Sequence, residues 1–404
     1  MATPKLKLGN DKWATKQRSL LAYNDEGNNF KSLPFQVERL SGGSYVGRNG
    51  LIQYAATEEP RIDFTNYSKG ALLLEPQRTN YATYSNDASQ WSNITQNGTV
   101  TATANYSVAP DGTNTATRLQ MSVSGSGYAL KSRSTTSFFG DYSASVYLKT
   151  TSGNNQNVCM TGRNAGNNVF TVTGEWQRFE INGSTTSGLN AYFNLGVYTS
   201  FTGADNPIDI LVWGGQLEAG DYSTSYIPTT NSAATRIVDF TENDSIPGDL
   251  INSTEGTIFI DFEYLYETTS SSSTDANRDY FVLGTSADVS EGISIDNYRS
   301  QFRVFVQGSG MTTQSIGNNT TGAAQPNTRY KLAVKYKTGD CKAYLNGSLL
   351  GSGTGTVNFV TDLDGIFFSY NSSSRPYKNQ KRVYDLQYFD TALTDAELTT
   401  LTTL

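Results

Sequence analysis

Histidine is absent from this 404-residue chain, and cysteine is scarce. Without histidine there can be no Ser-His-Asp or Cys-His nucleophilic site, no histidine general base and no histidine-ligated zinc. Cys159 and Cys341 are too few for a disulfide framework, and we interpret both as small buried hydrophobic residues. Any catalysis would therefore depend on carboxylate, lysine, tyrosine or cysteine chemistry.

Charge and long apolar runs are also sparse. Charged residues make up 17% of the chain, and 30 basic against 37 acidic residues leave a net charge of -7. The basic residues are scattered, whereas a nucleic-acid binder is expected to carry a positive stripe, so we expect no nucleic-acid partner. No segment approaches the roughly 20 apolar residues of a membrane helix, and the first residues do not resemble a signal peptide. We expect synthesis in the cytoplasm and no membrane insertion.

What the chain has in abundance points to an all-β protein. It contains 37 Gly, 25 Tyr and 19 Phe, and short apolar runs recur between Asn, Ser, Thr and Gly. Such runs of β-branched and aromatic residues, closed by turn residues, are typical of antiparallel strands. The length exceeds that of one core, so two tandem β-sandwich domains are expected.

The first two segments differ in regularity. Residues 1–70 mix charge, proline and isolated aromatics, which suggests an attachment or oligomerisation segment; extra strands of the next domain are the alternative. Residues 71–235 contain about eight strand-like runs, such as "DYSASVYLKT" and "IDILVWGGQLEAG", and predict a jelly roll. Much of its core is expected from Tyr147, Trp176, Phe179 and Trp213.

Residues 236–404 predict a second sandwich. The run "VKYKTGDCKAYLNG" indicates a hairpin that turns at Thr338, Gly339 and Asp340. The polar residues 268–276 predict a surface loop. Thr394 and Glu397 have capping-box spacing and predict a short C-terminal helix.

Two stretches carry a resemblance to a known family. "GALLLEPQRTNYATYSNDASQW" and "VWGGQLEAGDYSTSYIPTTNSAATR" resemble the start and end of a domain that recurs in bacteriophage tail, fibre and structural proteins. The resemblance implies a jelly roll similar to carbohydrate-binding modules. Physically, residues 72–74 should form a buried strand, and Arg78 can clamp the turn by bonding carbonyls, Glu75 or Glu218. We interpret the motif as a staple that joins the domain ends.

The second domain resembles concanavalin A-like and laminin-G-like sandwiches, through "RYKLAVKYKTGDCKAYLNGSLLGSG" and "RVYDLQYFDTALTDAELTTL". That resemblance implies binding of glycans or proteins, often with calcium. Asp362 and Asp364 are the nearest candidate calcium ligands, although a pair of turn-forming aspartates is the alternative.

One loop of the second domain has the composition of a sugar site. Aromatic faces stack on sugar rings, and amides or guanidinium groups bond hydroxyls. The loop "SYNSSSRPYKNQ" holds such groups, so the candidate glycan-binding residues are Tyr370, Arg375, Tyr377 and Asn379. An exposed rim or a subunit contact is the alternative interpretation.

The resemblances together imply a phage virion component on the particle exterior, a tail or head fibre subunit that binds host surface polysaccharide. We expect a homotrimer attached to other virion proteins through residues 1–70, with no cofactor other than calcium. A purely structural decoration protein is the alternative. A glycan-degrading tailspike would need two carboxylates, such as Asp275 with Asp279 or Asp362 with Asp364. Such pairs arise by chance and no β-helix repeat is present, so no enzyme activity is expected.

Overall fold

A computed structural model describes residues 2–16, 18–22, 33–265, 281–285, 291–297, 301–318, 325, 327–368 and 380–404. Within these ranges the paired strands are antiparallel, and the helical structure is confined to one 3-10 turn and one short C-terminal helix. The predicted all-β class is therefore confirmed. No helix of the described ranges combines the length and apolarity that a membrane crossing requires.

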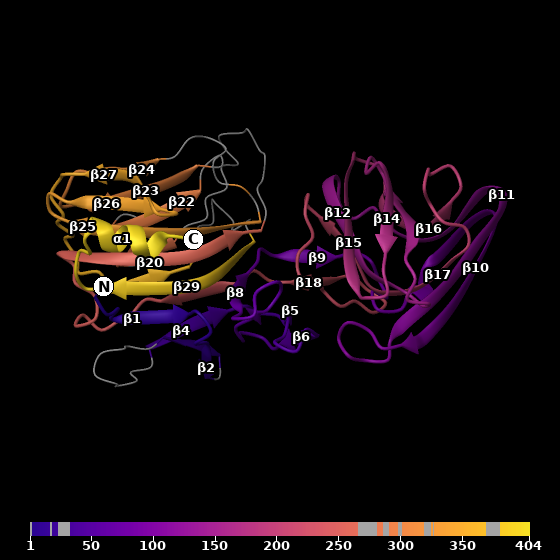
Figure 1. The fold of residues 1–404 in the computed structure, drawn as a ribbon, viewed down its shortest axis with the longest axis horizontal. Helices are drawn as coiled ribbons and strands as arrows, with labels where there is room; N and C mark the ends of the chain where they lie inside the picture. Colours follow the sequence, from indigo (N-terminus) through magenta and orange to yellow (C-terminus); the bar gives the residue numbers. More distant parts are fainter. Residues whose placement is uncertain are drawn as a thin grey trace. The chain divides into compact units, whose positions relative to one another are not determined.

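The chain forms two compact units. Unit 1 comprises Met1–Gly50, Ala55–Gln77 and Ile237–Leu404, and unit 2 comprises Leu51–Tyr54 and Arg78–Arg236. Unit 2 is thus almost entirely an insertion into unit 1. This division differs from the expected ranges 1–70, 71–235 and 236–404, because strands from the first 77 residues pair with the last strand of unit 1. Figure 1 shows these indigo N-terminal strands beside the yellow C-terminal strand.

Unit 1 is built from two sheets. The first contains, in spatial order, β27 (Ser348–Gly353), β26 (Cys341–Leu345), β25 (Thr328–Lys337), β20 (Glu255–Tyr264), β29 (Lys381–Phe389), β8 (Ala71–Leu74) and β7 (Ile62–Asp63), and β1 (Leu6–Gly9) also pairs with β29. The second contains β2 (Ala14–Lys16), β3 (Ser19–Ala22), β4 (Leu33–Glu38), β19 (Phe240–Asn243), β28 (Gly365–Phe367), β21 (Phe281–Gly284), β22 (Gly292–Asn297), β23 (Phe302–Gln307) and β24 (Gln314–Asn318). The short β5 (Gly43–Val46) also lies in unit 1.

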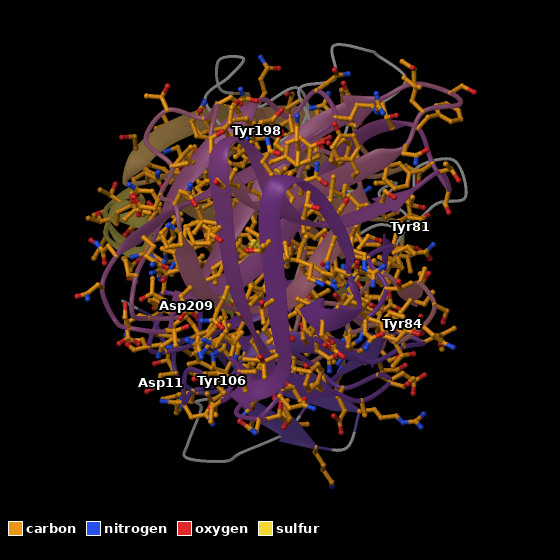
Figure 2. All side chains as sticks on the ribbon, turned by 90° about the vertical axis from the view of Figure 1, so that its right-hand side faces the viewer. Asp11, Tyr81, Tyr84, Tyr106, Tyr198 and Asp209 are labelled. Carbon is orange, nitrogen blue, oxygen red and sulfur yellow. The ribbon has the colours of Figure 1, made fainter. Side chains whose placement is uncertain are left out.

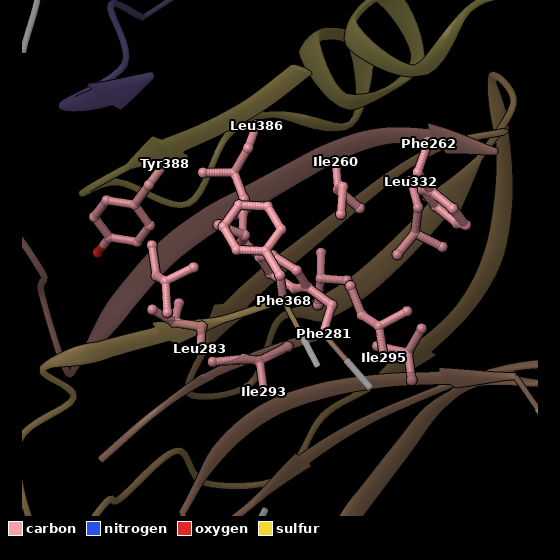
Figure 3. Packing of buried hydrophobic residues seen from close by; sticks show 14 of the residues in the cluster. Ile260, Phe262, Phe281, Leu283, Ile293, Ile295, Leu332, Phe368, Leu386 and Tyr388 are labelled. Carbon is pink, nitrogen blue, oxygen red and sulfur yellow. The ribbon is translucent and has the colours of Figure 1, made fainter. Parts of the chain in front are cut away.

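The core of unit 1 lies between these two sheets. Alternate residues of β20, namely Ile258, Ile260 and Phe262, are buried in one cluster with residues of the second sheet. Figure 3 shows Ile260 and Phe262 with Leu283 and Ile293 of the second sheet. Period-two alternation places such residues on one face of a strand. Full burial of each side chain stabilises the fold by roughly 1.5–3 kcal/mol.

The predicted strand at residues 72–74 is confirmed as β8, and its four residues are buried. It pairs with β29 and β7 of unit 1. The first motif, residues 70–91, therefore includes this strand of unit 1, and the chain then enters unit 2 at Arg78.

Unit 2 has one large sheet that folds over itself. In spatial order its strands are β14 (Asn167–Val172), β13 (Gln156–Gly162), β16 (Ala191–Tyr198), β11 (Ala116–Thr135), β17 (Ile208–Ala219), β12 (Gly140–Thr150) and β15 (Gln177–Thr185), while β10 (Ser92–Ser107) pairs along β11. The long β11 belongs to both halves, because residues 128–135 pair with β16 and residues 117–121 with β17. Strands β12 and β16, which are not hydrogen-bonded neighbours, pack across the core. The result is the expected antiparallel sandwich.

The ends of unit 2 close with a small sheet of β9 (Arg78–Asn80) and β18 (Ala234–Arg236). Of the four predicted core aromatics, Trp213 is buried with Tyr226, and Tyr147 and Trp176 pack partly buried against them. Phe179 packs partly buried against the main core. Ile52 of β6 (Ile52–Ala55) joins the Trp213 cluster, and its N–H donates to Pro110 O at 2.9 Å.

Three further local predictions are confirmed. Helix α1 (Asp395–Thr402) has the capping box, with reciprocal bonds between Thr394 and Glu397. The hairpin between β25 and β26 turns at the predicted residues, with Asp340 N–H donating to Lys337 O at 2.9 Å. Both cysteines are free and buried.

Candidate functional site

The four candidate residues of the predicted glycan loop, Tyr370, Arg375, Tyr377 and Asn379, lie outside the described residues, as do residues 268–276 and the carboxylates Asp275 and Asp279. These sites stay predictions.

The predicted calcium ligands Asp362 and Asp364 differ in exposure. Asp362 is exposed, and Asp364 is partly buried just before β28. Burial raises the pKa of Asp364, and its main chain bonds to Ile246 N–H and Gly284 O. Across the described ranges, no group of three or more His, Cys, Asp or Glu side chains is arranged to hold a metal. The calcium site stays a prediction, and the turn interpretation fits the main-chain bonding of Asp364.

A buried charged cluster lies where the chain leaves unit 1 and returns to it. Arg61 Nη1 donates to Glu75 Oε2 at 2.6 Å, and Arg61 Nη2 pairs with Asp239. Arg39 Nη1 donates to Asp239 Oδ1 at 2.8 Å. Burial lowers the pKa of Arg61, but the charges of Asp239 and Glu75 outweigh it, so the net shift is upward. All four side chains are buried and mutually paired, so we assign the cluster a structural role.

The second half of the motif is held in unit 2 by another buried network. Glu218 accepts hydrogen bonds from Gln216 Nε2 at 2.7 Å and from Thr224 N–H at 2.9 Å. Asn80 Nδ2 donates to Ile227 O at 2.8 Å. Polar side chains thus tie the exit strand to the entry strand, which agrees with the interpretation of the motif as a staple.

The clamp role of Arg78 stays a prediction. The Arg78 guanidinium lies over the Tyr222 ring, 4.8 Å from its centroid. Glu75 also pairs with Arg61, which lies in the segment before the motif.

An aromatic strip in unit 2 is the best candidate for ligand binding. It consists of Tyr81, Tyr84, Arg133, Phe138 and Phe139. Arg133 Cζ lies 5.8 Å from the centroid of the Tyr84 ring, and the Tyr81 and Phe138 ring centroids are 5.0 Å apart. Tyr84 is 36% exposed and Phe139 is 72% exposed. The segments 81–84 and 133–138 therefore present aromatic faces beside a guanidinium group, the combination that sugar recognition requires.

The backbone of Tyr84 is strained. Its φ is +53°, and within the described chain it is the one aromatic residue in the left-handed region; eight of the ten such non-glycine residues are Asn or Asp. A bulky residue there costs on the order of 1–3 kcal/mol. The conformation is held by the bond from Trp91 Nε1 to Tyr84 O at 3.0 Å. Strain that the surrounding structure maintains is common at binding sites.

The strip carries positive charge at its Arg133 end. Arg133 Nη2 donates to Gln90 O at 2.8 Å, and Lys131, two residues earlier on β11, is 2% exposed. Burial lowers the pKa of Arg133. Burial also lowers the pKa of Lys131, and the charge of Arg133 lowers it further while Asp87 raises it.

A second exposed aromatic residue in unit 2, Tyr106, lies beside an arginine that is paired with a carboxylate. Arg118 lies 4.9 Å from the Tyr106 ring centroid and donates Nε to Asp209 Oδ1 at 2.8 Å. The Asp209 carboxylate also accepts from Thr151 Oγ1 at 2.9 Å. Figure 2 shows Tyr106 and Asp209 together at the lower left of the view, and Tyr81 with Tyr84 at the right. Tyr106 and its partners therefore provide a matched comparison for the strip.

Unit 1 also contains neighbouring carboxyls that the sequence did not reveal as a pair. Asp261 and Asp385 are direct partners across β20 and β29. They are 3% and 6% exposed, so a bound polysaccharide would not reach them. We assign them no role with a substrate.

Sequence reasoning did not predict the strip, although the sequence holds a partial signal for it. Tyr81 and Tyr84 lie inside the first motif, residues 70–91. Lys131 and Arg133 have strand spacing of two, which places both side chains on one face of β11. That pattern could have indicated a local cationic face, but not its contact with Tyr84.

No protein-family model matches the chain, and no curated protein matches it. Solved structures with partial similarity include the receptor binding domain of botulinum neurotoxin C/D mosaic serotype, with 14% identity, 40% of each chain covered and a TM-score of 0.32. Domain 4 of a GH43 extracellular arabinanase from Geobacillus stearothermophilus, solved with arabinotriose, has 18% identity and a TM-score of 0.31 over 46% of this chain and 84% of its own. The Ruminococcus gnavus IT-sialidase CBM40 has 16% identity and a TM-score of 0.28 over 38% and 84%. These TM-scores are low, and the candidate site consists of residues of this chain alone.

Proposed function

We propose that this chain is a glycan-binding adhesin and that the aromatic strip of unit 2 is its binding surface. The observation that carries the proposal is Tyr84, whose exposed ring is held beside Arg133 by a strained backbone. Tyr81, Phe138 and Phe139 extend the apolar surface on which sugar rings can stack. Binding occurs without catalysis, since the strip contains no carboxyl group.

The biological setting is part of the same proposal. The motifs at residues 70–91 and 212–236 resemble those of phage fibre and tail proteins, so we place the chain on the exterior of a virion. Unit 1 carries the laminin-G-like resemblance, and we propose that other virion proteins bind residues 1–70. In a homotrimer, weak single contacts would add up to firm attachment. Calcium binding at Asp362 and Asp364 remains part of this proposal.

Attachment through residues 1–70 needs a test that keeps the strands of unit 1. Truncation would remove β1, whose four residues pair with β29. Leu40 offers a better probe, because its side chain is 75% exposed. We expect Leu40→Asp to reduce incorporation into particles while leaving the thermal unfolding of the free protein unchanged.

Glycan binding is tested with a panel of host surface polysaccharides and the variant Tyr84→Asn. Asn tolerates the left-handed backbone, so the variant removes the ring without adding strain. We expect affinity to fall about two- to twelvefold, as loss of one aromatic contact of roughly 0.5–1.5 kcal/mol predicts.

The matched control is Tyr106→Asn, which removes an exposed ring that also lies beside an arginine. It should bind like the unsubstituted protein. If the control weakens binding and Tyr84→Asn does not, the binding surface is the Tyr106 group. If the protein retains no polysaccharide of the panel, glycan binding is wrong and a decoration protein is the better interpretation.

A further inference from the structure

Lys131 and Arg133 are neighbouring cations in unit 2 whose observed hydrogen bonds, among the described residues, go to main-chain carbonyls, while Asp87 acts on Lys131 through its charge. They are two residues apart on β11, so their side chains leave the same face roughly 6–7 Å apart. Lys131 Nζ donates to Ser89 O at 3.1 Å and to Trp91 O at 2.9 Å, while Arg133 donates to Gln90 O. These acceptors are neutral carbonyls.

The acidic group that acts on Lys131 is Asp87, and the observed hydrogen bonds of its carboxylate are to other groups. Asp87 Oδ1 accepts from Ser89 N–H at 3.0 Å and from Thr117 Oγ1 at 3.4 Å, and it caps the 3-10 helix η2 (Ala88–Gln90). Within the described ranges, the observed side-chain hydrogen bonds of Lys131 and Arg133 all end on carbonyl oxygens. Arg133 Nε is buried without a hydrogen-bond partner.

Two other partly buried arginines of this chain, Arg329 and Arg118, are paired with carboxylates. Arg329 donates Nε and Nη2 to the two oxygens of Asp261, both at 2.6 Å, and Arg118 is paired with Asp209. Burying a cation without an anion is costly, because the charge loses its hydration. The chain bears this cost at the strip, the same place where it holds Tyr84 in a strained conformation.

We propose that this cation pair selects acidic sugars, with a sugar carboxylate bound by Arg133 and the sugar ring stacked on Tyr84. This inference rests on the glycan-binding function proposed above. A guanidinium offers two parallel N–H donors that match a carboxylate. The partly exposed guanidinium of Arg133 would supply them, and buried Lys131 would add positive potential without contact. The ligand class is therefore a uronic-acid or other carboxylate-bearing polysaccharide.

The test titrates the full chain with trigalacturonic acid and with its neutral methyl ester, at low and high salt. Calorimetry reports affinity, and NMR follows the Arg133 Nε–H signal, assigned by its loss in Arg133→Gln. We expect the acid to bind about tenfold or more tightly than the ester, as a charge-assisted hydrogen bond predicts. Salt should reduce that difference, and Arg133→Gln should bind both forms equally.

The matched control is Arg178→Gln. Arg178 also lies over a tyrosine ring, 5.5 Å from the Tyr147 centroid, and its Nε is also buried without a partner. It interacts electrostatically with Glu180, so its charge is not isolated. This variant should keep the preference for the acid.

Two results would overturn the inference, and they are distinguishable from failure of the proposed function. Equal binding of acid and ester would contradict acid selection while leaving glycan binding intact. Binding of neither form would also contradict it, whatever the polysaccharide panel shows. Failure of glycan binding itself is read from the panel and from Tyr84→Asn.

Discussion

At the scale of single residues, the two facing carboxyls of unit 1, Asp261 and Asp385, differ in their hydrogen-bond partners. Arg329 pairs with both oxygens of Asp261, whereas Asp385 accepts one bond, from Gln387 Nε2 at 2.7 Å. Asp385 Oδ1 is buried and has no partner among the described residues. Burial raises the pKa of Asp385 to about 6, although the bond from Gln387 acts in the opposite direction. Desolvation favours the neutral acid here because the nearby guanidinium is already committed to Asp261.

This raised pKa predicts a pH-dependent loss of stability. Between about pH 4 and pH 6 the folded state holds a proton on Asp385 that the unfolded chain releases, so stability falls as pH rises through this window. The loss is complete above pH 6 and amounts to about 3 kcal/mol. Asp385→Asn should therefore be more stable than the unsubstituted chain at pH 8 and similar to it below pH 4.

Urea unfolding at the two pH values measures this difference. The exposed Asp362→Asn is the control and should change stability by less than about 0.5 kcal/mol at either pH. Equal stability of Asp385→Asn and the unsubstituted chain at pH 8 would show that Asp385 is ionised in the fold at little cost.

At the scale of elements, strand β1 shows why the N-terminal segment is part of a sandwich. Leu6 and Leu8 are 1% and 2% exposed and lie in the main core of unit 1. Lys5 N–H and Asn10 N–H extend the pairing to the main chain of β29, at 2.8 Å each. A strand with one buried face and paired backbone groups contributes to the fold as much as any other edge strand.

The strand predicts a large effect of one core substitution. Leu8→Ala should lower the free energy of unfolding by about 2–5 kcal/mol, because it leaves a cavity between the sheets. Thr15→Ala, on exposed β2, should change it by less than about 0.5 kcal/mol. Thermal or urea unfolding measures both. If Leu8→Ala behaves like the control, β1 is a detachable arm and not a structural strand.

At the scale of the whole molecule, the chain leaves unit 1 and returns to it at adjacent points. Asp239 N–H donates to Glu75 O at 3.0 Å, and in unit 2 Arg78 faces Arg236 across the β9–β18 pair. Each unit has its own buried core. Because the two ends of the insertion are neighbours in each unit, unit 2 can be replaced by a short linker without distorting the strands of unit 1.

The insertion predicts that the two units fold separately. A fragment of residues 78–236 should show a cooperative thermal transition, lowered by loss of the Ile52 contact. Unit 1 with those residues replaced by a short Gly-Asn linker should also unfold cooperatively. Circular dichroism and dispersed NMR spectra would measure this. A linker-joined unit 1 that remains unfolded would show that unit 2 is required for its folding.

The amino-acid sequence by itself determined the features that depend on neighbouring residues. Strand periodicity established the all-β class, and the Thr394 capping box and the turn at Gly339 followed from local spacing. The tertiary structure decided which strands meet: β1 and β8 joined β29 across more than 300 residues, because pairing between distant strands leaves no local pattern. It also decided the candidate site. The sequence shows that Lys131 and Arg133 share a face, but only the fold places Tyr84 beside Arg133 and directs the observed side-chain hydrogen bonds of both cations, among the described residues, to main-chain carbonyls.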